Sequence, residues 1–485
     1  MSKRRIILWL GLAVLPTGCA VGPDYERPSA PVPSHFKEAD GWKPAEPSQP
    51  ASGTDWWTVY NDPVLDQLER QVEISNQTLA QAEAAWRQAV AAARAAGAAL
   101  YPTVGVSADA EKFRSNAGSV TTAGDQLERT TVRGGSRNSY SLGASASWEL
   151  DIWGKIRRTI ESDVASAKAS EADLAAARLS AQAALATNYV DLRVIDEQKL
   201  LFDATVESYA RSLQITQNQY NAGVVAKADV ITAQTQLQAA QSQQIALGVQ
   251  RAQLEHAIAV LIGKPPEEFS IAPATLGAAI PVVPTGVPSS LLERRPDIAS
   301  AERQMAAANA QIGVAISAYF PDLTLSATDG FASTAVAGLL KASNNVWSLG
   351  GTIAGTLLDF GARKYQVQEA RAAYDQTVAA YRETVLTAFQ QVEDQLAALR
   401  ILEQQYAVAE QTRRSADEAV QLTLNEYKAG TVAYTSVVTA QVTALNAALT
   451  LSSIRENRLV ASIALIQALG GGWSVPSDFQ SKQLP

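Results

Sequence analysis

The chain has 485 residues, and its 48 acidic and 40 basic side chains give a formal net charge of −8 at pH 7. This balance argues against a nucleic-acid-binding protein, which needs a basic surface to meet the phosphates. Two histidines, two methionines and one cysteine supply too few groups for a His/Cys metal cluster or a cysteine nucleophile. No convincing glycine-rich phosphate loop or nucleophile elbow occurs. We therefore expect no enzyme, no metal site and no cofactor other than a covalent lipid.

The N-terminus has the features of an export signal. Three basic residues at positions 3–5 precede an apolar run from Ile6 to Leu15, which is too short to span a bilayer. The run leads into Pro16-Thr17-Gly18-Cys19, which resembles a cleavage site. A buried helix is the alternative interpretation.

Cys19 is the only cysteine of this exported chain, so no disulfide can form within it. Lipidation explains it best: an S-diacylglycerol and an N-acyl chain anchor stably, because each buried methylene contributes about 0.8 kcal/mol. Lipoprotein signals usually carry leucine three residues before the cysteine, where this chain has Pro16. Ala20 is not the acidic residue that indicates retention in the inner membrane. We predict a lipoprotein signal peptide at 1–18 and lipid attachment at Cys19.

An internal duplication organises the rest of the chain. Tyr220-Asn-Ala-Gly223-Val-Val returns as Tyr427-Lys-Ala-Gly430-Thr-Val, and 430 − 223 gives a shift of 207. Further upstream, Tyr101-Pro102 matches Phe320-Pro321 at a shift of 219, so the first repeat carries 12 extra residues (219 − 207). The insertion falls in 115–138, which is rich in Gly, Ser and Thr and is predicted to be a loop.

Each repeat contains one stretch that predicts a very long helix. Residues 155–222 and 363–429 contain neither Gly nor Pro and are rich in strong helix formers. Either stretch would reach roughly 100 Å if fully helical, so it must pack along other helices. The alternative is a cytosolic coiled coil. Between the repeats, 264–288 holds six prolines and is predicted to be a linker.

Alternating residues predict two strands in each repeat. From Tyr140 to Leu150 apolar residues alternate with polar ones, with aromatic residues near the ends. The same face recurs at 347–357, and partner strands begin after the two aromatic-proline pairs, at 104–108 and 323–327. A half-buried soluble sheet would show a similar pattern.

Four strands are too few to close a membrane barrel, which needs about eight, and an open edge is not tolerated inside lipid. The edges must therefore pair between chains. Two chains would give eight strands and a filled lumen, whereas three would give twelve strands and leave room for a passage. The polar alternate faces favour three chains.

These features resemble the TolC-like outer-membrane factors, in particular the NodT-type lipoprotein branch that serves resistance-nodulation-division (RND) efflux systems. The resemblance covers essentially the whole mature chain. Its most specific motifs are Cys19-Ala-Val-Gly-Pro-Asp-Tyr25, Trp56-Trp57 with Asp62-Pro63, Leu292-Glu-Arg-Arg-Pro-Asp-Ile298 with Ala301-Glu302, and Ala468-Leu-Gly-Gly-Gly-Trp473.

The resemblance implies an α+β membrane protein: a homotrimer with a 12-stranded transmembrane β-barrel and a long α-helical coiled-coil barrel in the periplasm. It implies two partners, a periplasmic adaptor (membrane fusion) protein and an inner-membrane RND antiporter. The expected segments are 1–18 (signal peptide), 19–66 (lipidated equatorial segment), 67–102 (helix), 103–150 (first β-hairpin with a surface loop), 151–263 (first helical hairpin), 264–295 (equatorial linker), 296–320 (helix), 321–359 (second β-hairpin), 360–470 (second helical hairpin) and 471–485 (equatorial tail).

The resemblance also places the functional residues at the two repeated turns. These turns would be the tips of the helical hairpins, where Gly223, Val224, Gly430 and Thr431 are candidates for adaptor contact. Glycine also suits the end of a long helix for purely structural reasons. The second tip would line the aperture that closes the resting channel. The gate candidates are Glu426, Tyr427, Tyr434, Asp229 and Lys227.

The tips depart from the family pattern in their charges. Members of the family often carry an arginine before the tip tyrosine and an aspartate after the turn, whereas this chain has Glu426 and Thr439 at those places. The usual ion-pair lock is therefore not expected. In a trimer, three copies of Glu426 would form a ring that favours cations, unless the residue is simply a solvated glutamate. Tyr427 and Tyr434 would either stack across the threefold axis or serve as packing residues.

We expect a passive exit channel in the outer membrane, which conducts drugs or other small toxic compounds and is opened by the adaptor. One alternative is a type I secretion duct for polypeptides. Another is a structural lipoprotein that braces the membrane without conducting.

Overall fold

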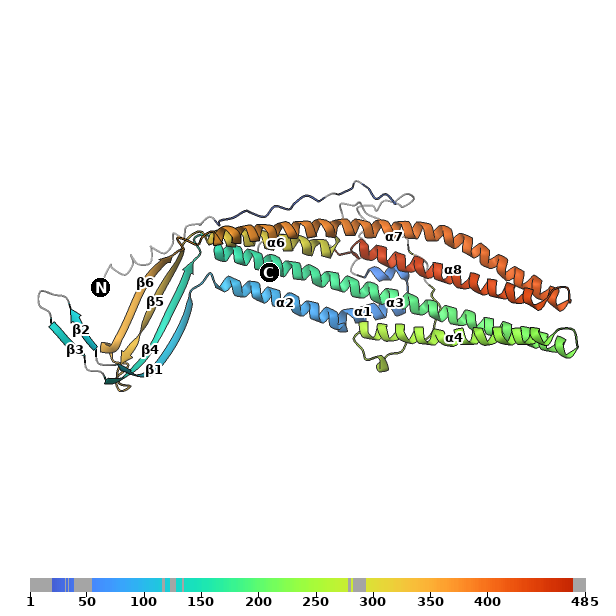
Figure 1. Ribbon diagram of the computed structural model, residues 1–485, viewed down its shortest axis with the longest axis horizontal. Coiled ribbons are helices and arrows are strands. Elements are labelled where there is room, and N and C mark those ends of the chain that lie inside the picture. The colour runs from blue at the N-terminus through green and yellow to red at the C-terminus, as the bar shows by residue number, and fades with distance from the viewer. Residues whose placement is uncertain are drawn as a thin grey trace.

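The molecule is long, with its main sheet at one end and its helices running away from that sheet (Figure 1). The structure, a computed structural model, describes residues 20–30, 32–33, 35–38, 55–115, 118–122, 128–132, 135–277, 281 and 294–473. The predicted signal peptide, the lipid site Cys19 and the last twelve residues of the predicted tail, 474–485, lie outside the described residues.

Helices make up most of the described chain. The two longest have 67 residues each, which corresponds to roughly 100 Å of helix. The helices are η1 (Trp56–Tyr60), α1 (Pro63–Ser75), α2 (Gln77–Ala98), α3 (Lys155–Asn221), α4 (Lys227–Leu261), η2 (Pro266–Glu268), α6 (Pro296–Ser317), η4 (Ala342–Asn344), α7 (Ala362–Lys428) and α8 (Tyr434–Ala468).

The duplication appears in the helix boundaries residue for residue. Helices α3 and α4 become α7 and α8 when 207 is added to both ends, and α2 becomes α6 when 219 is added. Repetition at this level means that both halves use the same local signals, chiefly a glycine after each long helix. The two repeats are therefore two copies of one supersecondary unit.

Four strands form the main sheet, and every neighbouring pair is antiparallel. They are β1 (Thr103–Ser115), β4 (Gly135–Leu150), β5 (Asp322–Ser333) and β6 (Asn345–Ala354), in the order β1-β4-β5-β6. Leu323 lies between Leu150 and Ile353, so the apolar faces predicted from alternation lie on one side of the sheet. Strands β1 and β6 are its two open edges.

The insertion in the first repeat is not simply a loop. Within 115–138 the structure has a second, two-stranded sheet, in which β2 (Gly118–Thr122) pairs with β3 (Glu128–Val132). The Thr and Val residues of this segment favour strands. Its Gly and Ser residues, which favour loops, led to the wrong prediction.

The single helix predicted at 67–102 is also wrong, because the chain forms α1 and α2 with a break at Asn76. That residue is extended, with φ −65° and ψ 123°, and its side chain accepts a hydrogen bond from the backbone N–H of Leu79 at 3.0 Å. The same amide donates to the carbonyl of Leu261 at 2.7 Å. Asn76 therefore caps α2 and fixes it to the end of α4.

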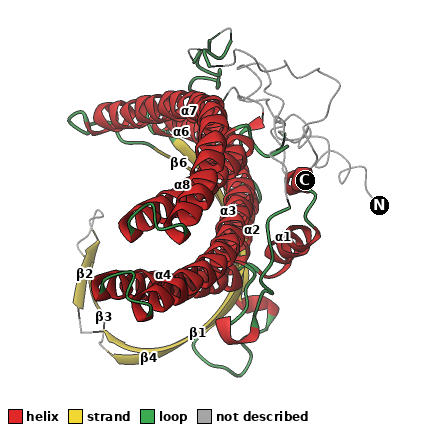
Figure 2. Cartoon of the chain, turned by 90° about the vertical axis from the view of Figure 1, so that its right-hand side faces the viewer, coloured by secondary structure: helices red, strands yellow, loops and turns green. Residues whose placement is uncertain are grey.

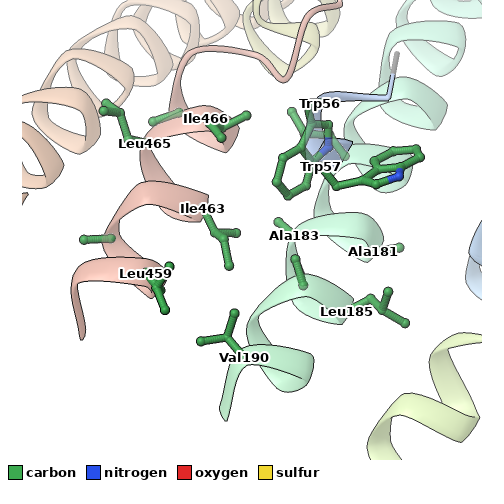
Figure 3. Close-up of a cluster of buried hydrophobic side chains, with 14 of the residues drawn as sticks. Trp56, Trp57, Ala181, Ala183, Leu185, Val190, Leu459, Ile463, Leu465 and Ile466 are labelled. Atoms are coloured by element: carbon green, nitrogen blue, oxygen red, sulfur yellow. The ribbon is translucent and has the colours of Figure 1, made fainter. Parts of the chain in front are cut away.

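The main hydrophobic core lies where the N-terminal segment crosses the long helices. Trp56 and Trp57 pack edge to face, with ring centroids 6.1 Å apart, and lie beside α3 (Figure 3). The indole nitrogen of Trp56 donates to Gln182 at 3.2 Å. Leu185 of α3 and Leu459 of α8 belong to the same buried cluster, so this core joins the two repeats.

Seen along the long axis, the helices form a curved wall, and β1 and β4 follow the same curve (Figure 2). Along the wall α2 packs on α3, α3 on α6 and α6 on α7. Helix α8 is long and apolar enough to cross a membrane by composition. It packs along α7 for much of its length, however, and forms the second helical hairpin with it.

Candidate functional site

The free ends of the two helical hairpins are built alike. In the first, the backbone N–H of Gly223 donates to Tyr220 O at 2.9 Å, and that of Val224 donates to Gln219 O at 2.9 Å. Gly430 and Thr431 form the equivalent pair of bonds in the second tip. Both glycines have φ +75°, and a Cβ added at either one would meet no atom within 4 Å. Backbone conformation, and not lack of space, therefore explains glycine at these positions.

The four candidates for adaptor contact are all exposed at these tips. Thr431 adds a side-chain hydrogen bond, from its hydroxyl to the carbonyl of Glu426 at 2.9 Å. The first tip places Val224 in the equivalent position, where it exposes an apolar side chain. The tips therefore offer hydrogen-bonded turns with a small polar and a small apolar side chain.

Tyr427 and Tyr434 are buried inside one chain, between the two hairpin ends. Their ring centroids are 5.3 Å apart, with the planes tilted by 56°, and both rings pack with Ala233 and Val437. The hydroxyl of Tyr427 donates to Thr216 of α3 at 3.3 Å. Of the two roles predicted for these rings, the structure therefore shows packing. Stacking across a threefold axis would require both rings to leave this cluster.

The charged gate candidates lie in the same tips, at the start of α4 and near the end of α7. Glu426 and Lys227 are exposed and Asp229 is partly buried, and within the described chain none of the three makes a salt bridge. Burial raises the pKa of Tyr434 to about 12, and the neighbouring Tyr427, Tyr209 and Asp229 act in the same direction. Both hydroxyls therefore stay protonated at neutral pH, and the tips are held together by packing and neutral hydrogen bonds.

Sequence reasoning missed a second contact between the hairpins. The side chain of Gln441 on α8 donates to the hydroxyl of Ser212 on α3 at 2.9 Å, and both residues are buried. No local sequence signal marks this pair, because the two residues are 229 positions apart. Together with the Tyr427 bond, it ties the second hairpin to the first near the tips.

The linker between the repeats is fastened to three helices by a buried charge network. Asp196 of α3 accepts hydrogen bonds from Arg251 at 2.7 Å, from Arg193 at 3.2 Å and from the backbone N–H of Ala274 at 3.1 Å. Arg193 also donates to the carbonyl of Ala272 at 2.7 Å. Arg455 of α8 donates to the carbonyl of Leu276 at 2.7 Å. The linker thus connects α3, α4 and α8.

A pair of carboxyl groups lies between the same two repeats. Asp191 of α3 and Glu456 of α8 lie close enough for each to affect the pKa of the other. Burial, followed by the charge of Asp191, raises the pKa of Glu456 from 4.5 to about 7. Burial raises the pKa of Asp191 as well. The pair therefore holds a shared proton below about pH 7.

This pair predicts a pH-dependent stability. Between pH 4.5 and about 7 the folded chain holds a proton that the unfolded chain has lost, so the free energy of unfolding should fall as pH rises through that window. Glu456→Gln should remove this part of the pH dependence and leave the chain more stable than the parent at pH 8. Thermal unfolding in detergent at pH 5, 6, 7 and 8 measures it. An unchanged pH profile in the variant would contradict the assignment.

Comparisons with known proteins agree with this architecture. The sequence profile of the family described as "Outer membrane efflux protein" matches residues 68–264 and 287–471, one segment in each repeat. The pyoverdine export outer membrane protein OpmQ of Pseudomonas aeruginosa is 31% identical over 448 residues, which cover 92% of this chain and 93% of the relative. The probable efflux pump outer membrane protein TtgC of Pseudomonas putida is 28% identical over 475 residues, covering 98% and 96%.

Solved structures share the fold over nearly the whole length. The outer-membrane channel OprN superposes with a TM-score of 0.84 at 30% identity, covering 94% of this chain and 100% of that one. The Campylobacter jejuni CmeC outer membrane channel gives a TM-score of 0.85 at 24% identity, covering 95% and 97%. With its internal repeats, its open four-stranded sheet and its long helical hairpins, the chain belongs to the outer membrane efflux protein family.

Proposed function

We propose that this chain is the outer-membrane exit channel of a tripartite efflux pump, and that it conducts drugs or other small toxic compounds passively. The observation that carries this proposal is the curved sheet with two open edges, continued by helices of roughly 100 Å. Its edge strands expose apolar side chains, with Val106 84% and Leu349 77% exposed. A family of efflux channels is not a family of enzymes, and the channel needs no catalytic residue.

The proposed assembly is a homotrimer. An open sheet edge is not tolerated in lipid, so β1 and β6 must find partners in other copies. Three copies of four strands close a 12-stranded barrel that is wide enough for a passage. The curved helical wall then continues the barrel as a tube into the periplasm.

The partners and the anchor follow from the proposed role. A periplasmic adaptor would bind the exposed turns at Gly223 and Gly430, and an inner-membrane RND antiporter would load the substrate. Acylation of Cys19 with an S-diacylglycerol and an N-acyl chain would hold the chain to the membrane. Opening requires that the adaptor bind the open arrangement more tightly than the closed one.

The test is drug susceptibility in a strain that lacks its major outer-membrane ducts. The strain receives this chain with its neighbouring pump genes, and a matched strain receives the Cys19→Ala variant. Restored resistance is the expected result, and the variant reports how far resistance depends on the anchor. Unchanged susceptibility, despite trimers confirmed in the outer membrane, would reject the efflux role in favour of secretion or bracing.

The buried tyrosine pair predicts a leaky tip when it is broken. Tyr434→Ala should destabilise the contact between the hairpins by about 3 kcal/mol, because it empties a buried ring site. Conductance in a planar bilayer should then rise above that of the parent. Tyr220, the repeat counterpart of Tyr427, is exposed in the first tip, so Tyr220→Ala is the matched control and should conduct like the parent. Equal conductance of the two variants would exclude a closing role for the pair.

A further inference from the structure

Strand β1 changes character toward the end that lies farthest from the helices (Figure 1). On the face that it shares with the apolar side chains of β4, its residues are, in order, Val104, Val106, Ala108, Ala110, Lys112 and Arg114. Tyr140 of β4 lies opposite Ala110, and the positions opposite the two cations are the uncharged Asn138 and Ser136. The apolar face of the sheet therefore ends in two positive charges just beyond an aromatic residue.

The alternation of the strand separates its charges by sign. Asp109 and Glu111 lie on the opposite, polar face, where the hydroxyl of Ser141 donates to Asp109 at 3.0 Å. In a membrane barrel the apolar face meets lipid and the polar face lines the interior. In the proposed barrel the carboxylates therefore face the passage, whereas Lys112 and Arg114 face the surrounding lipid.

Cations at the other end of the sheet have partners within the chain. Three lie where the strands meet the long helices, and each forms an ion pair: Lys155 with Glu149, Arg157 with Asp151 and Arg363 with Asp359. Lys112 and Arg114 are exposed, and neither forms an ion pair within the residues that the structure describes. Their charges are therefore available to a partner outside the chain.

One carboxylate also lies on the apolar face of the described sheet. Asp329 of β5 is opposite Ala144, which is opposite Val106. Its side chain accepts a hydrogen bond from the side-chain amide of Asn345 at 2.9 Å. Val106 precedes Lys112 by about 20 Å along the strand, which exceeds the screening length of about 8 Å at physiological ionic strength. Asp329 therefore does not neutralise the two cations.

These cations lie where the outer leaflet has its headgroups, because the helices extend from the other end of the sheet into the periplasm. We infer that Lys112 and Arg114 bind a phosphorylated glycolipid of that leaflet, of the lipopolysaccharide class, through its phosphate groups. The acyl chains of this lipid lie along the apolar residues of β1, such as Ala110 and Ala108. The inference goes beyond the efflux role, since it requires only that the sheet spans the outer membrane.

Both side chains suit this partner. Long lysine and arginine side chains keep their stems on apolar surface while their charged groups reach the headgroups. The guanidinium of Arg114 can bind two phosphate oxygens at once, and the ammonium of Lys112, on the same face, adds a point charge. Next neighbours on one face of a strand are about 7 Å apart, so both cations can contact the same headgroup.

Titration of the purified channel with diphosphorylated lipid A, followed by native mass spectrometry, tests the inference. Removing both charges with Lys112→Gln and Arg114→Gln should weaken binding about 25-fold, because each cation near an anionic lipid surface contributes about fivefold. Arg137→Gln is the matched control, because Arg137 is exposed at the same end of the sheet but lies opposite Phe113, on the polar face. This variant should bind like the parent, and so should the charge-conserving Lys112→Arg.

Lipid A without phosphates separates the headgroup from the acyl chains. The parent should bind it about as weakly as the double variant binds the phosphorylated lipid. Equal binding of the two lipids by the parent would overturn the inference, and this result needs no variant, so it stands even if a substitution disturbs the barrel. Equal weakening by Arg137→Gln and Arg114→Gln would overturn it too.

Inorganic phosphate distinguishes a lipid site from a simple phosphate site. Millimolar phosphate should leave the lipid bound to the parent, and displacement of the lipid would overturn its assignment as the partner. A channel that restores drug resistance without binding the phosphorylated lipid would reject the lipid site and leave the efflux role intact.

Discussion

Asp196→Ala is expected to lower the free energy of unfolding by about 3–5 kcal/mol, because it leaves the buried Arg193 without its counter-charge and removes one of the two acidic partners of Arg251. The side chain of Arg193 is only 4% exposed, and that of Arg251 is 18% exposed. Both donate to the linker as well as to Asp196, at Ala272 and Ile271. Loss of the carboxylate should therefore also loosen the linker from the long helices.

Thermal unfolding in detergent measures the loss of stability, and limited proteolysis of the linker measures its release. Glu207→Ala on the same helix is the matched control, because its ion pair with Arg211 is 69% exposed on both sides. An exposed pair of this kind contributes at most about 1 kcal/mol. If Asp196→Ala were as stable and as resistant to protease as Glu207→Ala, the network would not be what holds the linker.

Gly470→Ala is expected to be much more damaging than Gly430→Ala, although both glycines have positive φ, +93° and +75°. A Cβ at Gly470 would lie 2.1 Å from the carbonyl oxygen of Arg294, whereas one at Gly430 would meet no atom within 4 Å. The alanine at 430 should therefore cost only the backbone term, about 1 kcal/mol. The alanine at 470 adds the clash with backbone and should cost about 3 kcal/mol or more.

The unfolding midpoints of the two variants, purified side by side, give this difference directly. The duplication supplies an independent repetition, because a Cβ at Gly263 would lie 2.1 Å from the carbonyl oxygen of Ser75. Gly263→Ala should therefore behave like Gly470→Ala, and Gly223→Ala like Gly430→Ala. If all four variants had similar unfolding midpoints, the close approach of α1 and of residue 294 to these helix ends would not be important for stability.

Most of the fold could be predicted because its signals are local and occur twice. The absence of Gly and Pro from 155–221, followed by Gly223, gives both the length and the end of α3, and the second repeat supports the prediction with α7. The strands followed from alternation and from the shift between repeats. The break at Asn76 was missed because asparagine both tolerates a helix and caps one, and only the neighbouring carbonyl of Leu261 decides between them.

The site was predicted less completely, because its contacts join residues distant in sequence. The tip glycines followed from the repeated turn. The burial of Tyr427 against Thr216, 211 residues away, could not be predicted, because it depends on how the two hairpins pack against each other. The network of Asp196 with Arg251 and the linker also joins residues that are distant in sequence. A single sequence does not reveal which of many charges on a long helix has a buried partner.

The strand order makes the sheet depend on a contact between residues far apart in the sequence. Strand β4 pairs with β5, although Leu150 and its partner Leu323 are 173 positions apart (323 − 150). A contact of such long separation forms slowly, because the chain between the two residues must first be ordered. The hairpins β1–β4 and β5–β6 are therefore expected to form before the central pair that joins them into one sheet.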